Sequence, residues 1–74
     1  MRLRPREFAL LVYLIENKRL LLTREQIVTR VWGQEYEGEY RTVDTHVKRI
    51  REKMGEAAKC IHTIWGVGYK IEDD

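Results

Sequence analysis

The sequence has one cysteine, Cys60, one proline, Pro5, and no long hydrophobic run among its 74 residues. A single cysteine excludes an internal disulfide, which favours a reducing compartment. No apolar stretch approaches the roughly 18 residues that a membrane-spanning helix needs. Arg2, Arg4 and Arg6 precede an apolar stretch, as in a signal peptide, but no small-residue cleavage site follows, so we reject that interpretation.

The sequence also lacks a strong excess of charge of either sign, since its net charge is only +2. Net charge therefore does not by itself indicate a nucleic-acid partner, and the distribution of charge has to decide. Residues 41–53 contain five Lys or Arg and only two acids, Asp44 and Glu52. Acidic residues gather instead in the loop at Glu35, Glu37 and Glu39. The chain is thus dipolar, with a basic segment beside an acidic one.

Residues that could bind a metal or perform catalysis are scarce. Cys60, His62 and His46 are too few for a structural zinc site, which usually needs four ligands. No glycine-rich phosphate loop precedes a helix, and no nucleophile has a plausible base nearby in the sequence. The sequence therefore predicts no cofactor and no enzymatic activity. A hydrophobic content of 43% in 74 residues is enough for one small domain, 1–74.

The first predicted helix spans residues 5–16 and begins at Pro5, whose fixed φ suits the first helical position. Arg4 is a poor cap because its side chain has no oxygen to accept the free amide hydrogens, and Asn17 is expected to end the helix in a left-handed conformation. Two apolar stripes run along this helix. One contains Phe8, Leu11, Val12 and Ile15, and the other contains Leu10 and Leu14. We expect the Leu10/Leu14 stripe to need cover from a missing N-terminal segment or from a second copy.

The remaining elements follow from local signals. Residues 20–22 are a short apolar run that suggests a brief strand. Thr23 and Gln26 form a predicted capping box for a helix 24–32, which Gly33 ends. Thr42 is the expected cap of a helix 42–54, which Gly55 ends, and residues 60–71 form a hairpin around a glycine-containing turn. Inward-facing residues of the second helix are Ile27, Val28, Val31 and Trp32. The predicted fold is mainly α with a small C-terminal β-hairpin, in the order of a winged helix-turn-helix.

Helix 42–54 is predicted to have one apolar face and one basic face. Val43, Val47, Ile50 and Met54 share one stripe, and Thr45, Lys48 and Arg49 point the other way. A helix of this diameter, about 10–12 Å, fits the DNA major groove, and an outward face bearing arginine suits the reading of base edges. The alternative is a surface helix with solvated charges, in which Arg49 pairs with Thr45 or Glu52 and Glu52 with Lys48. Asp44 lies in the first turn of this helix, where its negative charge is expected to interact favourably with the helix dipole or to anchor a basic neighbour.

Five segments, in order and spacing, resemble the C-terminal DNA-binding domain of OmpR/PhoB-type response regulators. They are residues 3–8 (LRPREF), 22–26 (LTREQ), 31–33 (VWG), 41–46 (RTVDTH) with Arg49 and Arg51, and 66–69 (GVGY). The resemblance runs from Leu3 to about Ile71. It implies a transcription factor of a bacterial two-component system that binds double-stranded DNA, with two copies on adjacent half-sites.

The resemblance also implies a role for individual residues. Thr45, Arg49 and His46 would lie over base edges, although phosphate contact or simple packing fits His46 as well. Residues implied to hold backbone phosphates are Trp32, Arg41, Thr42, Lys48, Arg51, Thr63 and Tyr69. The loop implied to face RNA polymerase is formed by Gln34, Glu35, Tyr36, Glu37, Gly38, Glu39 and Tyr40.

Three departures from the family accompany the resemblance. The N-terminal four-stranded sheet and the receiver domain are absent from this sequence, and Trp65 stands at the wing tip, where relatives often carry arginine. An indole cannot supply the charge that reaches into the minor groove, so we expect Trp65 to cap the hairpin or pack on sugar edges. A protein-interaction module that keeps the winged-helix shape but does not bind DNA is the competing hypothesis.

Overall fold

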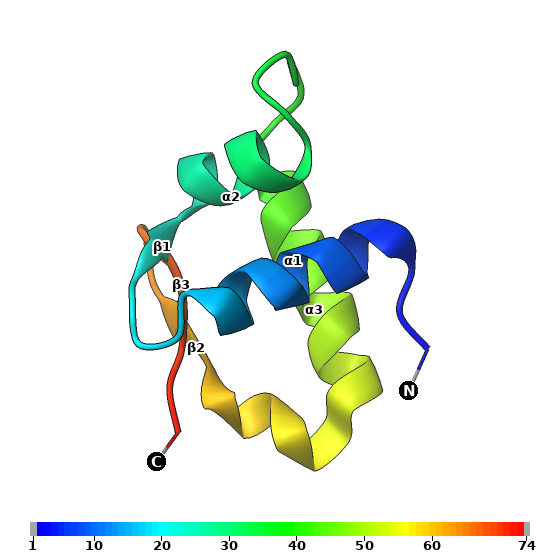
Figure 1. Cartoon of the computed structure of the whole chain (residues 1–74), viewed down its shortest axis with the longest axis vertical. Coiled ribbons are helices and arrows are strands. Elements are labelled where there is room, and N and C mark those ends of the chain that lie inside the picture. The colour runs from blue at the N-terminus through cyan, green and yellow to red at the C-terminus, as the bar shows by residue number, and fades with distance from the viewer. Residues whose placement is uncertain (1, 74) are drawn as a thin grey trace.

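The computed structural model describes residues 2–73 and consists of three helices and a small sheet (Figure 1). Predictions that fall on Met1 and Asp74 lie outside these residues. The elements are α1 (Pro5–Glu16), β1 (Leu22–Thr23), α2 (Arg24–Val31), α3 (Arg41–Met54), the 3-10 helix η1 (Gly55–Cys60), β2 (Ile61–Ile64) and β3 (Gly68–Ile71). The predicted winged helix-turn-helix fold is therefore confirmed. Within residues 2–73, no helix is both long and apolar enough to cross a membrane.

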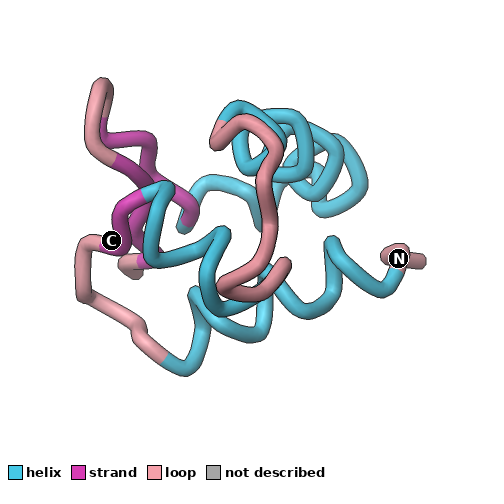
Figure 2. Tube along the Cα trace, turned by 90° about the horizontal axis from the view of Figure 1, so that it is seen from above, coloured by secondary structure: helices cyan, strands magenta, loops and turns pink. Residues whose placement is uncertain are grey.

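The sheet has three antiparallel strands in the order β1-β3-β2, so the predicted hairpin gains an extra strand. Leu22 pairs with Tyr69 and Ile61 pairs with Ile71. The strand expected at residues 20–22 is corrected to Leu22–Thr23, the two residues that pair with Tyr69 and Gly68 of β3. A Cβ atom at Gly68 would lie 1.9 Å from the carbonyl oxygen of Leu22, so only glycine allows this close approach. Figure 2 shows the strands grouped on one side of the helices.

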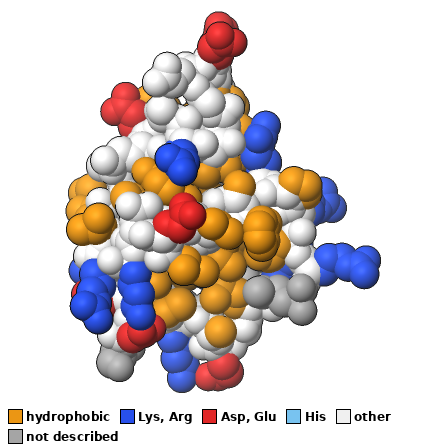
Figure 3. Space-filling view, in the orientation of Figure 1, with side chains coloured by type: hydrophobic (Ala, Val, Ile, Leu, Met, Phe, Trp, Pro, Cys, Tyr) orange, Lys and Arg blue, Asp and Glu red, His pale blue; other side chains and the backbone are white. Residues whose placement is uncertain are grey.

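The face of α1 that enters the core differs from the prediction. Leu10, Leu11 and Leu14 are buried, whereas Phe8 and Ile15 are 60% and 55% exposed. The expectation of an uncovered Leu10/Leu14 stripe is therefore wrong, and the other predicted stripe is divided, since Leu11 is buried while Phe8 and Ile15 are exposed. Apolar side chains gather over the middle of the molecule, where α1 crosses in front (Figure 3).

A buried ion pair lies on the same face of α1 as Leu10 and Leu14. Glu7 is 1% exposed and continues the buried stripe, and its Oε1 accepts hydrogen bonds from Lys53 Nζ at 2.6 Å and from the Arg4 backbone N–H at 3.0 Å. The hydrogen bond from Lys53, helped by the one from Arg4, holds the pKa of the Glu7 carboxyl below its usual value. A charged residue on the core side of α1 is tolerated because α3 supplies the partner.

Helix ends follow the predictions in part. Pro5 begins α1, the Thr23/Gln26 capping box is present with hydrogen bonds of 2.8 and 3.1 Å, and Gly55 ends α3 with φ at 61°. Asn17 is not left-handed, since its φ is −115°; its side-chain amide instead donates to the Tyr13 carbonyl at 2.9 Å. Arg19, two residues later, has the left-handed conformation instead, with φ at 77°.

The remaining boundaries shift by one residue. Thr42 is not the cap of α3, because Tyr40 already has helical backbone angles and α3 begins at Arg41. The second helix ends at Val31 rather than 32, with Trp32 as the C-cap residue. Cys60 ends η1 instead of opening the hairpin, which begins at Ile61. The 3-10 helix η1, which carries the chain from the end of α3 to β2, was not predicted.

Candidate nucleic-acid interface

The polar face of α3 is open to solvent. The opposite face packs in the core, where Val43, Val47 and Ile50 are at most 1% exposed. That face is therefore inaccessible to a ligand. Arg41, Thr45, Lys48 and Arg49 are exposed. Thr45 donates a long hydrogen bond of 3.4 Å to the Arg41 carbonyl, a contact within the helix that leaves the residue on the surface. The separation of faces that the sequence predicts is therefore present.

Asp44 fixes the first turn of α3 against two other elements. Its Oδ1 accepts hydrogen bonds from Arg24 Nε at 2.8 Å and from the Tyr69 hydroxyl at 2.5 Å. Partial burial by itself would raise the pKa of Asp44, but the bonds from Arg24 and Tyr69 outweigh burial and lower that pKa. Asp44 thus joins α3 to the start of α2 and to β3, as expected for an anchor of a basic neighbour.

Tyr69 is part of the core as well as of this junction. The residue is 4% exposed, and its hydroxyl is directed to Asp44. Burial, and then the hydrogen bond to the Asp44 carboxylate, raise the pKa of Tyr69 to about 12. The hydroxyl expected at a phosphate is therefore already engaged inside the protein.

Alkaline titration should reveal the environment of Tyr69. Because its folded-state pKa lies above the unfolded value of 10, its contribution to stability is complete below pH 10 and is lost as the pH rises through about 12. We expect phenolate absorbance to develop for the other tyrosines first, with the Tyr69 signal appearing together with unfolding. A Tyr69→Phe variant should lack this late step; a late step of unchanged size in that variant would contradict the assignment.

Arg51 and Thr63 connect α3 to the wing. Arg51 Nη2 donates to the Ile61 carbonyl at 2.9 Å and to Thr63 Oγ1 at 2.8 Å, and its Cζ lies 5.7 Å from the centre of the Tyr69 ring. Both residues are half-buried. Their side chains hold β2 against α3, so the orientation of the wing depends on them.

Trp32, Thr42 and His46 form a cluster where α2 ends and α3 begins. The His46 ring meets the Trp32 ring edge-on with centroids 4.8 Å apart, and His46 Nδ1 lies 2.7 Å from the Thr42 carbonyl oxygen. Arg6 reaches this cluster from α1, with its Cζ 5.9 Å from the Trp32 ring centre and Nη1 donating to the Val31 carbonyl at 3.3 Å. This contribution from Arg6 was not predicted, because it joins segments that lie far apart in the sequence.

The two loops predicted to be functional project from the core. Trp65 is 86% exposed in the turn between β2 and β3, and the wing tip therefore presents an indole. In the segment 34–40, the Tyr36 hydroxyl donates to the Glu39 carbonyl at 3.3 Å, and Glu39 lies 3.7 Å from Arg41 Nε. This segment extends away from the sheet between α2 and α3 (Figure 1).

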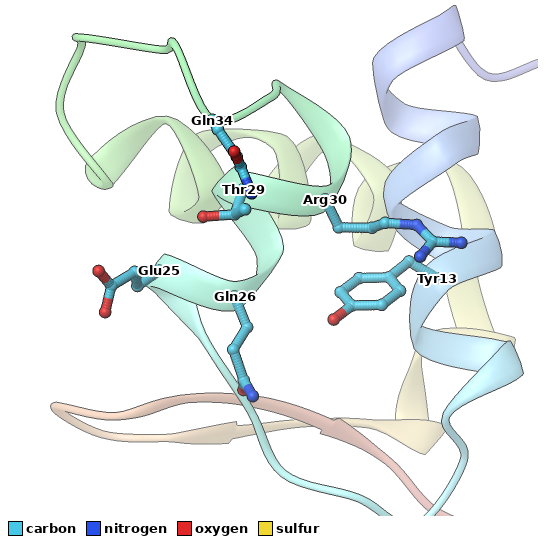
Figure 4. A pocket seen from close by; sticks show the side chains of 6 residues that line it. All are labelled: Tyr13, Glu25, Gln26, Thr29, Arg30 and Gln34. Carbon is cyan, nitrogen blue, oxygen red and sulfur yellow. The ribbon is translucent and has the colours of Figure 1, made fainter.

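A separate hollow lies between α1 and the outward side of α2 (Figure 4). Its volume is about 570 Å³, and Arg30 covers one side with its Cζ 5.6 Å from the Tyr13 ring centre. None of its lining residues belongs to α3. Within residues 2–73 there is also no cluster of three or more His, Cys, Asp or Glu that could hold a metal ion.

Residues 1–71 match the protein family described as "Transcriptional regulatory protein, C terminal". The chain belongs to this family. Its members are transcription regulators rather than enzymes, and the resemblance to OmpR/PhoB-type response regulators is confirmed. Transcriptional regulatory protein SrrA of Staphylococcus aureus is 51% identical over 74 residues, which cover 95% of this chain and 31% of SrrA.

Two solved structures illustrate the likeness within this family. The DNA-binding domain of Bacillus subtilis CssR is 41% identical, with a TM-score of 0.87 over 95% of this chain and 77% of that one. The Klebsiella pneumoniae RstA DNA-binding domain, solved in complex with the RstA box, is 26% identical, with a TM-score of 0.82 over 96% of this chain and 73% of that one. The chain spans about a third of the length of the curated relatives it matches.

Proposed function

We propose that this chain is the sequence-specific, double-stranded-DNA-binding module of a two-component transcriptional regulator, with α3 in the major groove. The observation that carries the proposal is the exposed row Thr45, Lys48 and Arg49 on a helix whose opposite face is fully buried. The family membership and the RstA domain solved on DNA support the same conclusion.

In this proposal Arg49 and Thr45 read base edges, while Arg41 and Lys48 hold phosphates. Guanidinium binds guanine O6 and N7 in a bidentate geometry, and lysine acts as a point charge on the backbone. Trp32, at the end of α2, and Thr42 and His46, in the first half of α3, lie where the groove rim would pass. Trp65 would lie against sugar edges at the wing tip.

Arg51, Thr63 and Tyr69 contribute chiefly by positioning the helix and the wing. Their side chains are bonded within the protein, and those bonds set the angle between α3 and β2. Arg51 has five N–H donors and uses only some of them in its bonds to Ile61 and Thr63, so a phosphate contact remains compatible with its place.

The proposals about location, the number of copies on DNA and RNA polymerase rest on the resemblance to OmpR/PhoB-type response regulators. We propose that the module acts in the bacterial cytoplasm without enzymatic activity, that two copies bind adjacent half-sites, and that residues 34–40 face RNA polymerase. Half-site spacing near one helical turn would follow if both copies use α3 in the same way.

Selection of bound sequences from random duplex DNA, followed by fluorescence-anisotropy titration, tests the proposal. We expect an enriched motif and affinity that falls with salt at a slope of about −0.9 per neutralised phosphate. Random duplex is the control and should bind more weakly. Absence of binding at low salt to any duplex would instead favour the protein-interaction module.

A further inference from the structure

We propose that the groove between the start of α1 and α3 is an additional contact site for a DNA backbone phosphate. The groove has a volume of about 520 Å³ and is lined by Arg4, Pro5, Arg6, Ala9, His46 and Arg49. This inference rests on the proposed function and extends the DNA surface from α3 onto a second helix.

The charge of the groove is the first argument. Three arginines and one histidine line it, and Arg4, Arg6 and Arg49 are all exposed. Glu7, the carboxylate nearest in sequence, is buried and accepts a hydrogen bond from Lys53 at 2.6 Å, so its charge is compensated. A guanidinium cluster favours phosphate, which it can bind in a bidentate fashion.

The position of the groove is the second argument. A helix about 10–12 Å across fills a major groove about 12 Å wide, so groups beside the helix meet the phosphates along the groove rim. His46 and Arg49 belong to α3, and Arg4 and Arg6 face them across this hollow. Arg6 also contacts Trp32, the residue already proposed to lie beside the backbone, so the cationic strip is continuous with that site.

The identity of residue 4 is the third argument. Arg4 occupies the N-cap position of α1, with extended backbone angles and no capping hydrogen bond from its side chain. Ser, Thr, Asp or Asn at this position would stabilise the helix by accepting a first-turn amide hydrogen. Arginine at this position therefore provides no stabilising cap but places a cation at the groove.

Arg4→Thr separates the two roles of this position. Threonine restores the cap, so the melting temperature should stay level or rise, while affinity for both the selected site and random duplex should fall together. The salt slope should be shallower by about 0.9, the value for one lost phosphate contact. The control is Lys18→Ala, which removes one positive charge near the other end of α1, where Lys18 pairs with Asp73. The salt dependence of DNA binding by this variant should be the same as that of the unsubstituted chain.

If DNA affinity depended on salt concentration with the same slope in Arg4→Thr and Lys18→Ala, the groove assignment would be overturned. If inorganic phosphate shifted the Arg4 Nε resonance while Arg4→Thr left the DNA slope unchanged, the groove would bind free anions and the assignment to DNA would also fall. Failure of the proposed function is distinct, because in that case the unsubstituted chain would not bind duplex DNA at all.

Discussion

Leu14→Ala is expected to lower the free energy of unfolding by about 2–5 kcal/mol, whereas Ile15→Ala should change it by no more than about 0.5 kcal/mol. The two residues are neighbours on α1, yet Leu14 is 1% exposed and Ile15 is 55% exposed. Removing the Leu14 side chain leaves a cavity in the core, while removing that of Ile15 only trims the surface. A domain of this size is only marginally stable, so the loss expected for Leu14→Ala is a large part of its total free energy of unfolding.

Urea unfolding followed by circular dichroism measures both effects. The midpoint should fall for Leu14→Ala with an unchanged slope, and Ile15→Ala serves as the matched control. Comparable losses in the two variants would show that Ile15 is covered in solution. Repeating the measurement over a range of protein concentrations would then reveal whether a second copy provides the cover.

The buried face of α1 shows where local pattern fails. Phe8, Val12 and Ile15 are as apolar as Leu10 and Leu14, so periodicity alone does not say which set faces the core. Glu7 also lies on the buried side, where its carboxylate is paired with Lys53 of α3. A contact between the first and third helices leaves no trace in the hydrophobic pattern of α1.

Elements fixed by short-range signals were predicted well. The capping box at Thr23 and Gln26, the apolar stripe of α3 and the stop at Gly55 each depend on residues within a few positions of one another. These signals were enough to predict the exposed face of α3, and hence the main part of the candidate interface. The family resemblance then supplied roles that local pattern alone does not.

Features that depend on distant contacts were predicted less well. The pairing of Leu22 with Tyr69 adds a strand to the hairpin, and nothing in either segment alone specifies that pairing. The groove contribution of Arg6 and the use of the Tyr69 hydroxyl by Asp44 are likewise contacts between distant segments. Several residues assigned to phosphates from the sequence therefore serve inside the fold as well.

Arg49→Ala should weaken binding to the selected DNA site about 5- to 150-fold, equivalent to about 1–3 kcal/mol for one bidentate base contact. Arg49 is exposed near the middle of α3, on the face opposite Val47 and Ile50. Random duplex offers the guanidinium no consistent base partner, so its affinity should fall much less. The ratio of the two affinities, measured by anisotropy at one fixed salt concentration, is the readout.

Two further variants separate geometry from charge. Arg49→Lys keeps the positive charge but loses the planar fork, so the preference for the selected site should fall nearly as far as in Arg49→Ala. Lys48→Ala removes a neighbouring charge from the same helix and should weaken selected and random duplexes alike. Both positions are exposed, so neither change should disturb folding.

Arg49 also borders the groove with Arg4 and Arg6, so these variants can show that it binds a phosphate rather than a base. If Arg49→Ala weakened both duplexes equally and Arg49→Lys restored binding, the side chain would be holding a phosphate at the rim. Base reading would then depend on Thr45 and the residues around it. The ratio of affinities for Arg49→Lys thus decides whether this arginine faces the floor of the major groove or its edge.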